Sequence, residues 1–193
     1  MVSKKYIILI FDGHGTGSDK GAVSGKFEEF EIVKKMCKAT YDYLRAIPKS
    51  KRKFVVAYPE KDKQMTIAQQ IALMKKYRKM GYIVIGLEEH MNSAAGKAGD
   101  GAEIWINTRC NLAKSCANKI LYQWKKIGQN SRGVKSGDLM FTNAFIGNSK
   151  VASLITEFGF VNNPTDRKIF NTDAEIKKAG IAIGKALVSA LKI

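Results

Sequence analysis

The stretch that decides the fold is Tyr6-Ile-Ile-Leu-Ile-Phe11, which passes directly into Asp12-Gly-His14-Gly15. A continuous apolar run that ends in a glycine-rich turn is typical of a buried parallel strand with a loop at its carboxyl end. The run is shorter than the core of a secretory leader, and no small-residue cleavage site follows it. We therefore expect a core strand here and a loop that presents His14.

Four further apolar runs of strand length alternate with helical patterns along the rest of the chain. The strands are expected at residues 54–58, 82–87, 102–106 and 152–156, and the helices at residues 27–46, 66–80, 111–126 and 173–191. Several strands are apolar at nearly every position, as strands are when both faces of a sheet are covered. The pattern predicts an α/β fold with a mixed, mostly parallel central sheet of about six strands and helices on both faces.

Length and composition predict one globular domain that spans residues 1–193. The chain has 193 residues, of which 45% are hydrophobic, and this is enough for one sizeable core. No window approaches the length of a membrane span. The cysteines number three, which does not suggest a disulfide framework. We expect the protein to be made and folded in the cytoplasm, as a monomer, and to act elsewhere only after release.

Charge is the most unusual property of the composition. Lys and Arg number 33 against 17 Asp and Glu, which gives a formal net charge of +16. Such a chain is attracted to polyanions, and nucleic acid, anionic membrane surfaces and anionic cell-wall polymers all qualify. A nucleic-acid-binding protein is the rival from another functional class. Against specific nucleic-acid binding, the basic residues are scattered, lysine outnumbers arginine, and no recognised motif or stacking array is present.

Histidine provides the first sign of a site. The chain has only two, His14 and His90, and each follows a predicted strand, which is where open α/β sheets place their ligands. A lone histidine is more often structural than catalytic. If the two strands are neighbours, however, both imidazoles can reach one zinc ion, and a carboxylate is then needed as the third protein ligand.

Glu29 is the better candidate for that third ligand in the Glu28-Glu29 pair. Ile32 and Val33 extend its face of the predicted helix toward the sheet. The alternative is an ordinary glutamate that is stabilised by the amino end of the helix.

Glu157 directly follows a predicted buried strand and precedes a glycine. Burial raises the pKa of a carboxyl group, which suits a general base that takes a proton from water and later delivers it to a leaving amine. The alternative is a strand-end carboxylate paired with one of the many lysines.

Six motifs, taken in order, resemble the type 3 N-acetylmuramoyl-L-alanine amidases, the zinc amidases of bacterial autolysins and phage endolysins. They are Ile10-Phe-Asp-Gly-His14-Gly15 with Asp19-Lys-Gly-Ala22, the glutamate Glu29 that opens a helix, Glu88-Glu-His90-Met-Asn-Ser-Ala94, Gly101-Ala-Glu103, Arg132-Gly-Val-Lys135 and Leu154-Ile-Thr-Glu157-Phe-Gly-Phe-Val-Asn162. Each motif alone is weak, but six in the family's order and spacing are specific and span nearly the whole chain.

The resemblance implies one catalytic zinc ion held by His14, Glu29 and His90, with Glu157 as the general base. The implied reaction is hydrolysis of the amide between N-acetylmuramic acid and L-alanine in peptidoglycan. Gly13 stands where proline is usual, and two carboxylates, Glu88 and Glu89, stand before the second histidine where a small polar and an apolar residue are usual. Whether Glu88 and Glu89 touch the metal stays open, and Tyr58-Pro59 replaces the usual Thr-Arg dipeptide.

Members of the family often carry a wall-binding module, and we expect no separate cell-wall-binding domain in this chain. The net positive charge is expected to hold the enzyme on anionic wall polymers or the membrane surface instead. Without a leader, a phage endolysin that lyses the host wall is favoured, and a bacterial autolysin of the same activity is the alternative. A remnant that binds wall without cutting it is a further alternative, which the presence of all four functional side chains disfavours.

Overall fold

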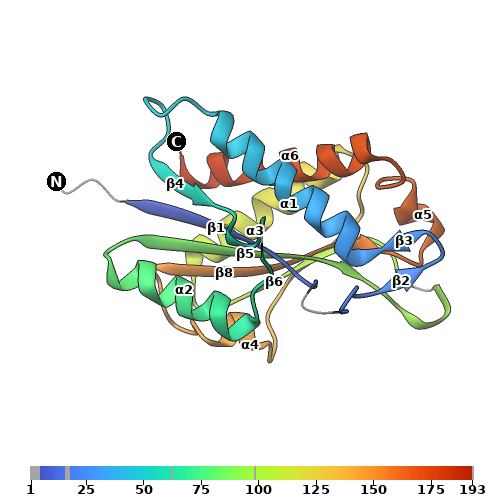
Figure 1. Cartoon of the computed structure of the whole chain (residues 1–193), viewed down its shortest axis with the longest axis horizontal. Helices are drawn as coiled ribbons and strands as arrows, with labels where there is room; N and C mark the ends of the chain where they lie inside the picture. The colour runs from blue at the N-terminus through green and yellow to red at the C-terminus, as the bar shows by residue number, and fades with distance from the viewer. Residues whose placement is uncertain (1–4, 16–17, 62, 98, 193) are drawn as a thin grey trace.

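A mixed six-stranded sheet forms the centre of the protein, whose computed structural model describes residues 5–15, 18–61, 63–97 and 99–192 (Figure 1). The strands are β1 (Tyr6–Asp12), β4 (Phe54–Ala57), β5 (Ile83–Asn92), β6 (Ala102–Ile106), β7 (Ser131–Lys135) and β8 (Val151–Phe160). Their spatial order is β4-β1-β5-β8-β6-β7, and neighbouring strands are parallel except β6 and β8. The predicted α/β fold with a mostly parallel sheet is confirmed.

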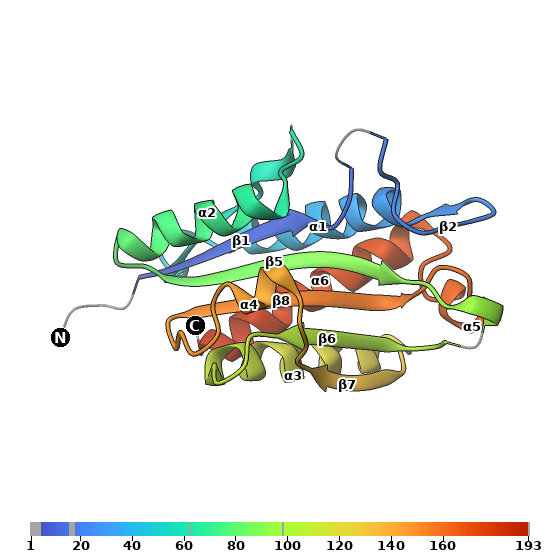
Figure 2. The same ribbon diagram turned by 90° about the horizontal axis from the view of Figure 1, so that it is seen from below.

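Helices cover both faces of this sheet. On one face lie α1 (Glu29–Ala46), α3 (Asn111–Lys126) and α6 (Asp173–Leu191), and on the other lie α2 (Ile67–Lys79) and the short α4 (Met140–Asn143) (Figure 2). The connections contain α5 (Pro164–Arg167), the 3-10 turns η1 (Pro59–Lys61) and η2 (Ala95–Lys97), and a hairpin of β2 (Val23–Ser24) and β3 (Phe27–Glu28). Within the described ranges, none of the helices combines the length and the apolar character needed to cross a membrane.

The apolar run that opens the chain is buried on both faces. Ile8 and Ile10 of β1 pack in the cluster under α1 and α6, whereas Ile7, Leu9 and Phe11 pack in the cluster under α2 and α4. Successive side chains of a strand point to opposite faces, so a strand between two helical layers needs apolar residues at every position.

Unequal strand lengths expose one end of β5. The strand β1 ends at Asp12, which pairs with Glu89, whereas β5 continues to Asn92. Beyond Glu89 the neighbour of β5 is β8, and His90 pairs with Glu157 there. Alternation along β5 sets Glu89 on the face covered by α1 and sets Glu88 and His90 on the opposite face. The end of the shorter strand thus leaves room for side chains from outside the sheet to reach His90.

The strands and helices differ from the sequence prediction in several places. Both β5 and β8 are longer than expected, so His90 and Glu157 lie within strands, because the β5–β8 ladder continues past the apolar segments. The strand β7 falls in a predicted loop, and its polar composition suits an edge strand that pairs only with β6. The first helix begins at Glu29 and not at residue 27, because Phe27 and Glu28 pair with β2.

Candidate metal centre

The structure brings His14, Glu29 and His90 together at the carboxyl end of the sheet. One potential ligand atom from each residue lies within 4.8 Å of the others. A single oxygen, Oε1 of Glu29, is 3.3 Å from Nε2 of His14 and 3.1 Å from Nδ1 of His90. The two imidazole rings meet edge to face, with their centroids 5.0 Å apart. The three residues proposed from the sequence therefore converge on one point.

Asp19 fixes the orientation of the His14 ring. Nδ1 of His14 donates a hydrogen bond to the Asp19 carboxylate at 2.8 Å, so that Nε2 faces Glu29. The same carboxylate accepts a hydrogen bond from the backbone N–H of Gly21 at 3.0 Å. The hydrogen bond that His14 donates to Asp19 lowers the pKa of Asp19, and the hydrogen bond that Glu29 accepts from His14 raises the pKa of His14. A carboxylate behind a histidine in this way holds the ring of a metal ligand in place.

Glu29 is the first residue of α1 and is almost completely buried, with 4% of its side chain exposed. Its Oε2 accepts a hydrogen bond from the backbone N–H of Ala22 at 2.8 Å, and its Oε1 accepts one from the N–H of Met91 at 2.9 Å. Burial raises the pKa of Glu29, but the two imidazoles and these donors outweigh it and lower the pKa to about 2. Glu29 is therefore ionised at any physiological pH. Its neighbour Glu28 instead pairs with Lys20 at 3.1 Å.

His90 lies between two carboxylates. Nδ1 faces Glu29, and Nε2 is 3.8 Å from Oε2 of Glu88. Burial lowers the pKa of His90, but hydrogen bonding to Glu29 and to Glu88 raises it well above its usual value. The backbone at Gly13 passes so close that a Cβ atom there would overlap the His90 ring. With the His90 ring where it lies, there is no room for a side chain at Gly13.

This donor set fits a zinc ion. Two imidazole nitrogens and one carboxylate oxygen are the ligands of catalytic zinc sites, which leave a further position for water or substrate. The carboxylate is ionised and the ring of His14 is fixed by an outer carboxylate, both of which favour metal binding. Within the described part of the chain, no other group of three such side chains meets the same criterion.

Glu157 lies beside this centre on β8. It pairs in register with His90 on one side and with Glu103 of β6 on the other. Its Oε2 is buried and has no hydrogen-bond partner among the residues that the structure describes. Burial raises the pKa of Glu157 to about 7; His90 acts to lower it, and the Glu29 and Glu103 carboxylates act to raise it further. At neutral pH this group is poised to accept or to release a proton.

Glu103 and two cations form a second layer next to Glu157. Its Oε2 is 2.7 Å from Nε of Arg132 and 2.7 Å from Nζ of Lys135, both on β7. These two cations lower the pKa of Glu103 despite its burial. These residues belong to the motifs Gly101-Ala-Glu103 and Arg132-Gly-Val-Lys135, to which the sequence alone assigns no role. The antiparallel register between β6 and β8, which a sequence does not reveal, is what places Glu103 opposite Glu157.

Glu89 belongs to a second group of buried carboxyl groups, separate from the metal ligands. We call this group the acid cluster and define it as Asp12, Glu60 and Glu89. Glu89 accepts a hydrogen bond from the Thr40 hydroxyl at 3.1 Å, and its other oxygen has no hydrogen-bond partner within the described part of the chain. Asp12 accepts a hydrogen bond from the Tyr58 hydroxyl at 2.7 Å. Glu89 lies under α1 and faces away from His90. Of the two unexpected glutamates, Glu88 therefore contacts a candidate ligand and Glu89 does not.

Burial raises the pKa of every member of the acid cluster. The pKa of Glu60 rises to about 7 and that of Glu89 to about 8, while that of Asp12 rises more modestly. The partners of these carboxyl groups are neutral donors, such as Thr40 and Tyr58, which compensate burial only in part. At neutral pH Glu89 is therefore largely protonated.

Taken together, the fold and site define an α/β protein with a two-histidine, one-glutamate centre and a buried carboxyl group beside it. The family described as N-acetylmuramoyl-L-alanine amidase matches residues 8–189. The chain belongs to this type 3 amidase family. Among curated proteins, no sequence matches the chain.

Solved structures agree with this assignment at the level of the fold. Cwp6 from Clostridium difficile superposes with a TM-score of 0.79 at 25% identity, over 96% of this chain and 29% of that chain. The catalytic domain of CwlV, an N-acetylmuramoyl-L-alanine amidase from Bacillus (Paenibacillus) polymyxa var. colistinus, gives 0.81 at 19% identity, over 97% and 99% of the two chains. The catalytic domain of CD27L endolysin, which targets Clostridia difficile, gives 0.67 at 22% identity, over 95% and 97%. This chain thus spans under a third of Cwp6 and nearly all of the other two.

Proposed function

We propose that this protein is a zinc-dependent N-acetylmuramoyl-L-alanine amidase, which hydrolyses the amide between N-acetylmuramic acid and L-alanine in peptidoglycan. The observation that carries the proposal is the convergence of His14, Glu29 and His90 beside the buried Glu157, in a chain of the amidase family. In this assignment the first three residues bind one zinc ion and Glu157 is the general base.

When bound, the zinc ion acts as a Lewis acid for amide hydrolysis. Glu29 supplies the negative charge of the ligand set, and Asp19 keeps Nε2 of His14 directed at the centre. Glu157 accepts a proton from the attacking water and returns it to the departing amine, for which a pKa near neutrality is suitable. Glu103 adds negative charge next to Glu157 and thereby keeps its proton affinity high.

The decisive experiment is mass spectrometry of peptidoglycan digested by the zinc-loaded protein. An amidase releases intact stem peptides with a free L-alanine amino group, whereas a peptidase or a glycosidase gives other fragments. Products cut within the peptide or within the glycan would refute the proposal.

Replacement of Glu157 by glutamine tests the general base separately from the metal. We expect Glu157→Gln to keep its zinc and to lose at least about 100-fold in wall hydrolysis, because general acid–base catalysis is worth that much or more. The matched control is Glu175→Gln on α6, where glutamine can keep the hydrogen bond that caps the helix, and this variant should hydrolyse walls at the normal rate. Near-normal hydrolysis by Glu157→Gln would remove this residue from the mechanism.

We further propose that residues 1–193 act as a single catalytic domain of a phage endolysin, made in the cytoplasm and active on the wall after release. A bacterial autolysin is the alternative, and the fold serves both, since solved neighbours include an endolysin domain and bacterial amidases. Expression in a susceptible host separates the two. An endolysin should leave cells intact until the membrane is permeabilised and should then lyse them, whereas lysis without permeabilisation supports the autolysin.

We also propose that the net charge of +16 holds the enzyme on anionic wall polymers or the membrane surface. Such attraction is screened as salt rises, with a Debye length of about 8 Å at physiological ionic strength. Binding to intact walls should therefore weaken as salt is added, and binding that does not respond to salt would argue against this role.

A further inference from the structure

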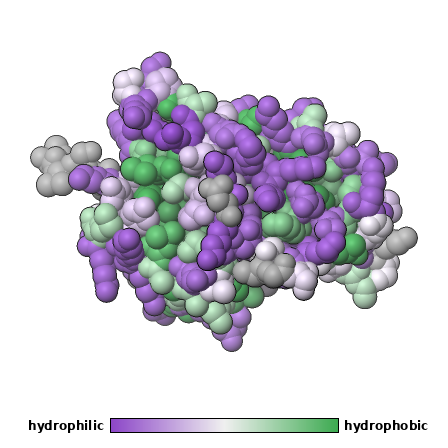
Figure 3. Space-filling model, in the orientation of Figure 1, coloured by the Kyte–Doolittle hydropathy of each residue, from purple (hydrophilic) through white to green (hydrophobic). Residues whose placement is uncertain are grey.

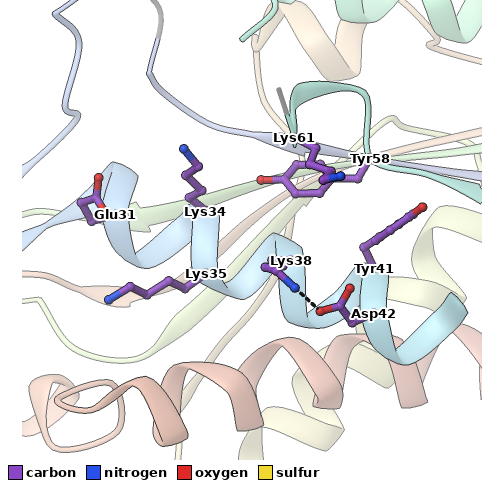
Figure 4. A pocket seen from close by; sticks show the side chains of 8 residues that line it. All are labelled: Glu31, Lys34, Lys35, Lys38, Tyr41, Asp42, Tyr58 and Lys61. Atoms are coloured by element: carbon purple, nitrogen blue, oxygen red, sulfur yellow. Dashed lines mark hydrogen bonds and ion pairs between the residues drawn. The ribbon is translucent and has the colours of Figure 1, made fainter. Parts of the chain in front are cut away.

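An open hollow of about 690 Å³ lies between α1 and η1 (Figure 4). One stripe of α1 forms its first wall, since positions three and four apart share a helix face. Tyr58 and Lys61, which come from the chain after β4, form the second wall. We call this hollow the lysine trough; it is lined by Glu31, Lys34, Lys35, Lys38, Tyr41, Asp42, Tyr58 and Lys61.

Two of the four lysines in the lysine trough form no ion pair with the described part of the protein. Lys38 pairs with Asp42 four residues later, and Lys35 pairs with Asp173 of α6 at 2.7 Å. Lys34 and Lys61, in contrast, have no carboxylate within 4.0 Å among the residues that the structure describes. Both are exposed, and Figure 4 shows Lys34 extending from α1 on the side where Lys61 lies. Hydrophilic residues also cover most of the surface over α1 and α6 (Figure 3).

The shape of the trough suits one extended chain. Its α1 wall spans Glu31 to Asp42, which at 1.5 Å per residue is about 16 Å. The Glu31 end of the trough is the end of α1 at which Glu29 also lies, although the two side chains point to different sides of the helix.

The chemistry of the lining favours a polyol phosphate over a nucleic acid. Two rings line the trough. Tyr58 is buried and its hydroxyl is already donated to Asp12. Tyr41 is half-buried and lies against Tyr58, with centroids 6.2 Å apart, and against Arg45, 5.9 Å from its centroid, which leaves little ring surface on which a base could stack. Carboxylates at the two ends of the α1 wall, Glu31 and Asp42, repel a chain made only of phosphates but accept hydrogen bonds from hydroxyl groups. Lysines supply the charges that phosphates require.

We propose that the lysine trough binds a single strand of poly(polyol phosphate), the anionic chain of teichoic-acid polymers. This inference rests on the proposed function, because it names the wall component that the enzyme holds while it acts on peptidoglycan. The binding is non-covalent. Phosphates contact Lys34 and Lys61, which have no carboxylate partner among the described residues, and Lys38, whose solvent-exposed pair with Asp42 is weak enough to be exchanged. Polyol hydroxyls contact the two carboxylates.

The test is the affinity of the zinc-loaded protein for purified poly(glycerol phosphate), measured by titration calorimetry at physiological salt. The variant combines Lys34→Gln, Lys38→Gln and Lys61→Gln. We expect it to bind about tenfold more weakly, which corresponds to three exposed ion pairs of ordinary strength.

A matched control removes the same charge elsewhere. Lys75, Lys76 and Lys79 are exposed on α2, on the opposite face of the sheet, and their triple change to glutamine should weaken binding less than twofold. Equal losses in the two variants would show attraction by net charge alone and would overturn the trough. Tighter binding of single-stranded DNA than of poly(glycerol phosphate), with the same dependence on the trough lysines, would overturn the assignment of the polymer.

Two further measurements are needed. The first identifies whether the polymer comes from the wall or from lipoteichoic acid, and the second tests the proposed function independently of polymer binding. Binding to walls before and after removal of their teichoic acid, and to vesicles with and without lipoteichoic acid, identifies which form the trough holds; no difference in either pair would refute the proposal. Hydrolysis of a soluble muropeptide, which lacks the polymer, should be equal in the wild type and the trough variant. Absence of that hydrolysis in the wild type would reject the amidase proposal and leave the affinity result standing.

Discussion

Two buried carboxyl groups at the carboxyl end of the sheet, Glu29 of the metal centre and Glu89 of the acid cluster, differ in protonation state. In the metal centre, Glu29 faces two imidazoles and two backbone N–H groups, and its pKa falls to about 2. In the acid cluster, Glu89 faces the Thr40 hydroxyl and has one oxygen without a partner, and its pKa rises to about 8. Both groups are almost fully buried. The donors around a buried carboxyl group, more than burial itself, therefore decide whether it is a metal ligand or a neutral part of the core.

The largest expected effect comes from exchanging carboxyl for amide at the two sites. Glu29→Gln should lose more than about 100-fold in zinc affinity, because it removes the only anionic ligand and outer-shell changes alone cost tenfold to 100-fold. Glu89→Gln should keep its zinc, because Glu89 faces α1 and is largely protonated already. Metal analysis and competition with a chelator measure both. Loss of zinc from Glu89→Gln with retention in Glu29→Gln would reverse the comparison.

The next effect is the response of stability to pH in the metal-free protein. The folded-state pKa values of Glu60 and Glu89, about 7 and about 8, lie above the ordinary value of 4.5. Their contribution to the free energy of unfolding is thus fully present below the ordinary value and is lost as the pH rises through 7 and 8. We expect urea unfolding between about pH 5 and about pH 9 to show a loss of several kcal/mol, since each unit of pKa difference corresponds to about 1.4 kcal/mol.

Glu29 behaves in the opposite sense, because its folded-state pKa is lowered. Its contribution is present at neutral pH and is lost only as the pH falls toward 2. Glu89→Gln should therefore flatten the alkaline part of the profile and leave the acid part unchanged. An unchanged alkaline part in that variant would assign the loss to other groups.

The smallest expected effect concerns the backbone next to His90. Gly13→Ala introduces a Cβ atom that overlaps the His90 ring, and the displaced ring should weaken zinc binding about tenfold. The control is Gly81→Ala, where an added Cβ atom meets nothing within 4 Å but the backbone has a φ of 90°. That variant should lose some stability and keep its zinc affinity. Normal zinc binding by Gly13→Ala would show that the ring position is not limiting.

Much of the fold could be predicted from the sequence, because the strands of this sheet are buried on both faces and leave continuous apolar runs. The edge strand β7 was missed, since an edge that pairs on one side can be built from Ser, Arg, Gly and Lys. The hairpin of β2 and β3 was missed because each strand has only two residues, too few for a periodic pattern.

The candidate site was predicted as a set of residues but not as an arrangement. The phase of the first helix favoured Glu29 over Glu28, and Glu29 is the one of the two that lies beside both histidines. The environment of Glu88 and Glu89 was not predicted, because the strand was expected to end at residue 87. Once β5 is known to reach Asn92, alternation alone separates the two glutamates onto opposite faces.

The pairing of His90 with Glu157 across β5 and β8 has a consequence for redesign. The backbone ladder between β5 and β8 sets the spacing of His90, a proposed metal ligand, and Glu157, the proposed base. Glu29 instead follows directly after the β2–β3 hairpin in the chain. A hairpin of different length or composition could be grafted at this point to alter the surroundings of Glu29. The distance between the ladder-held pair would be preserved, so the spacing of one metal ligand and the base can be kept while the segment that leads to the third ligand is varied.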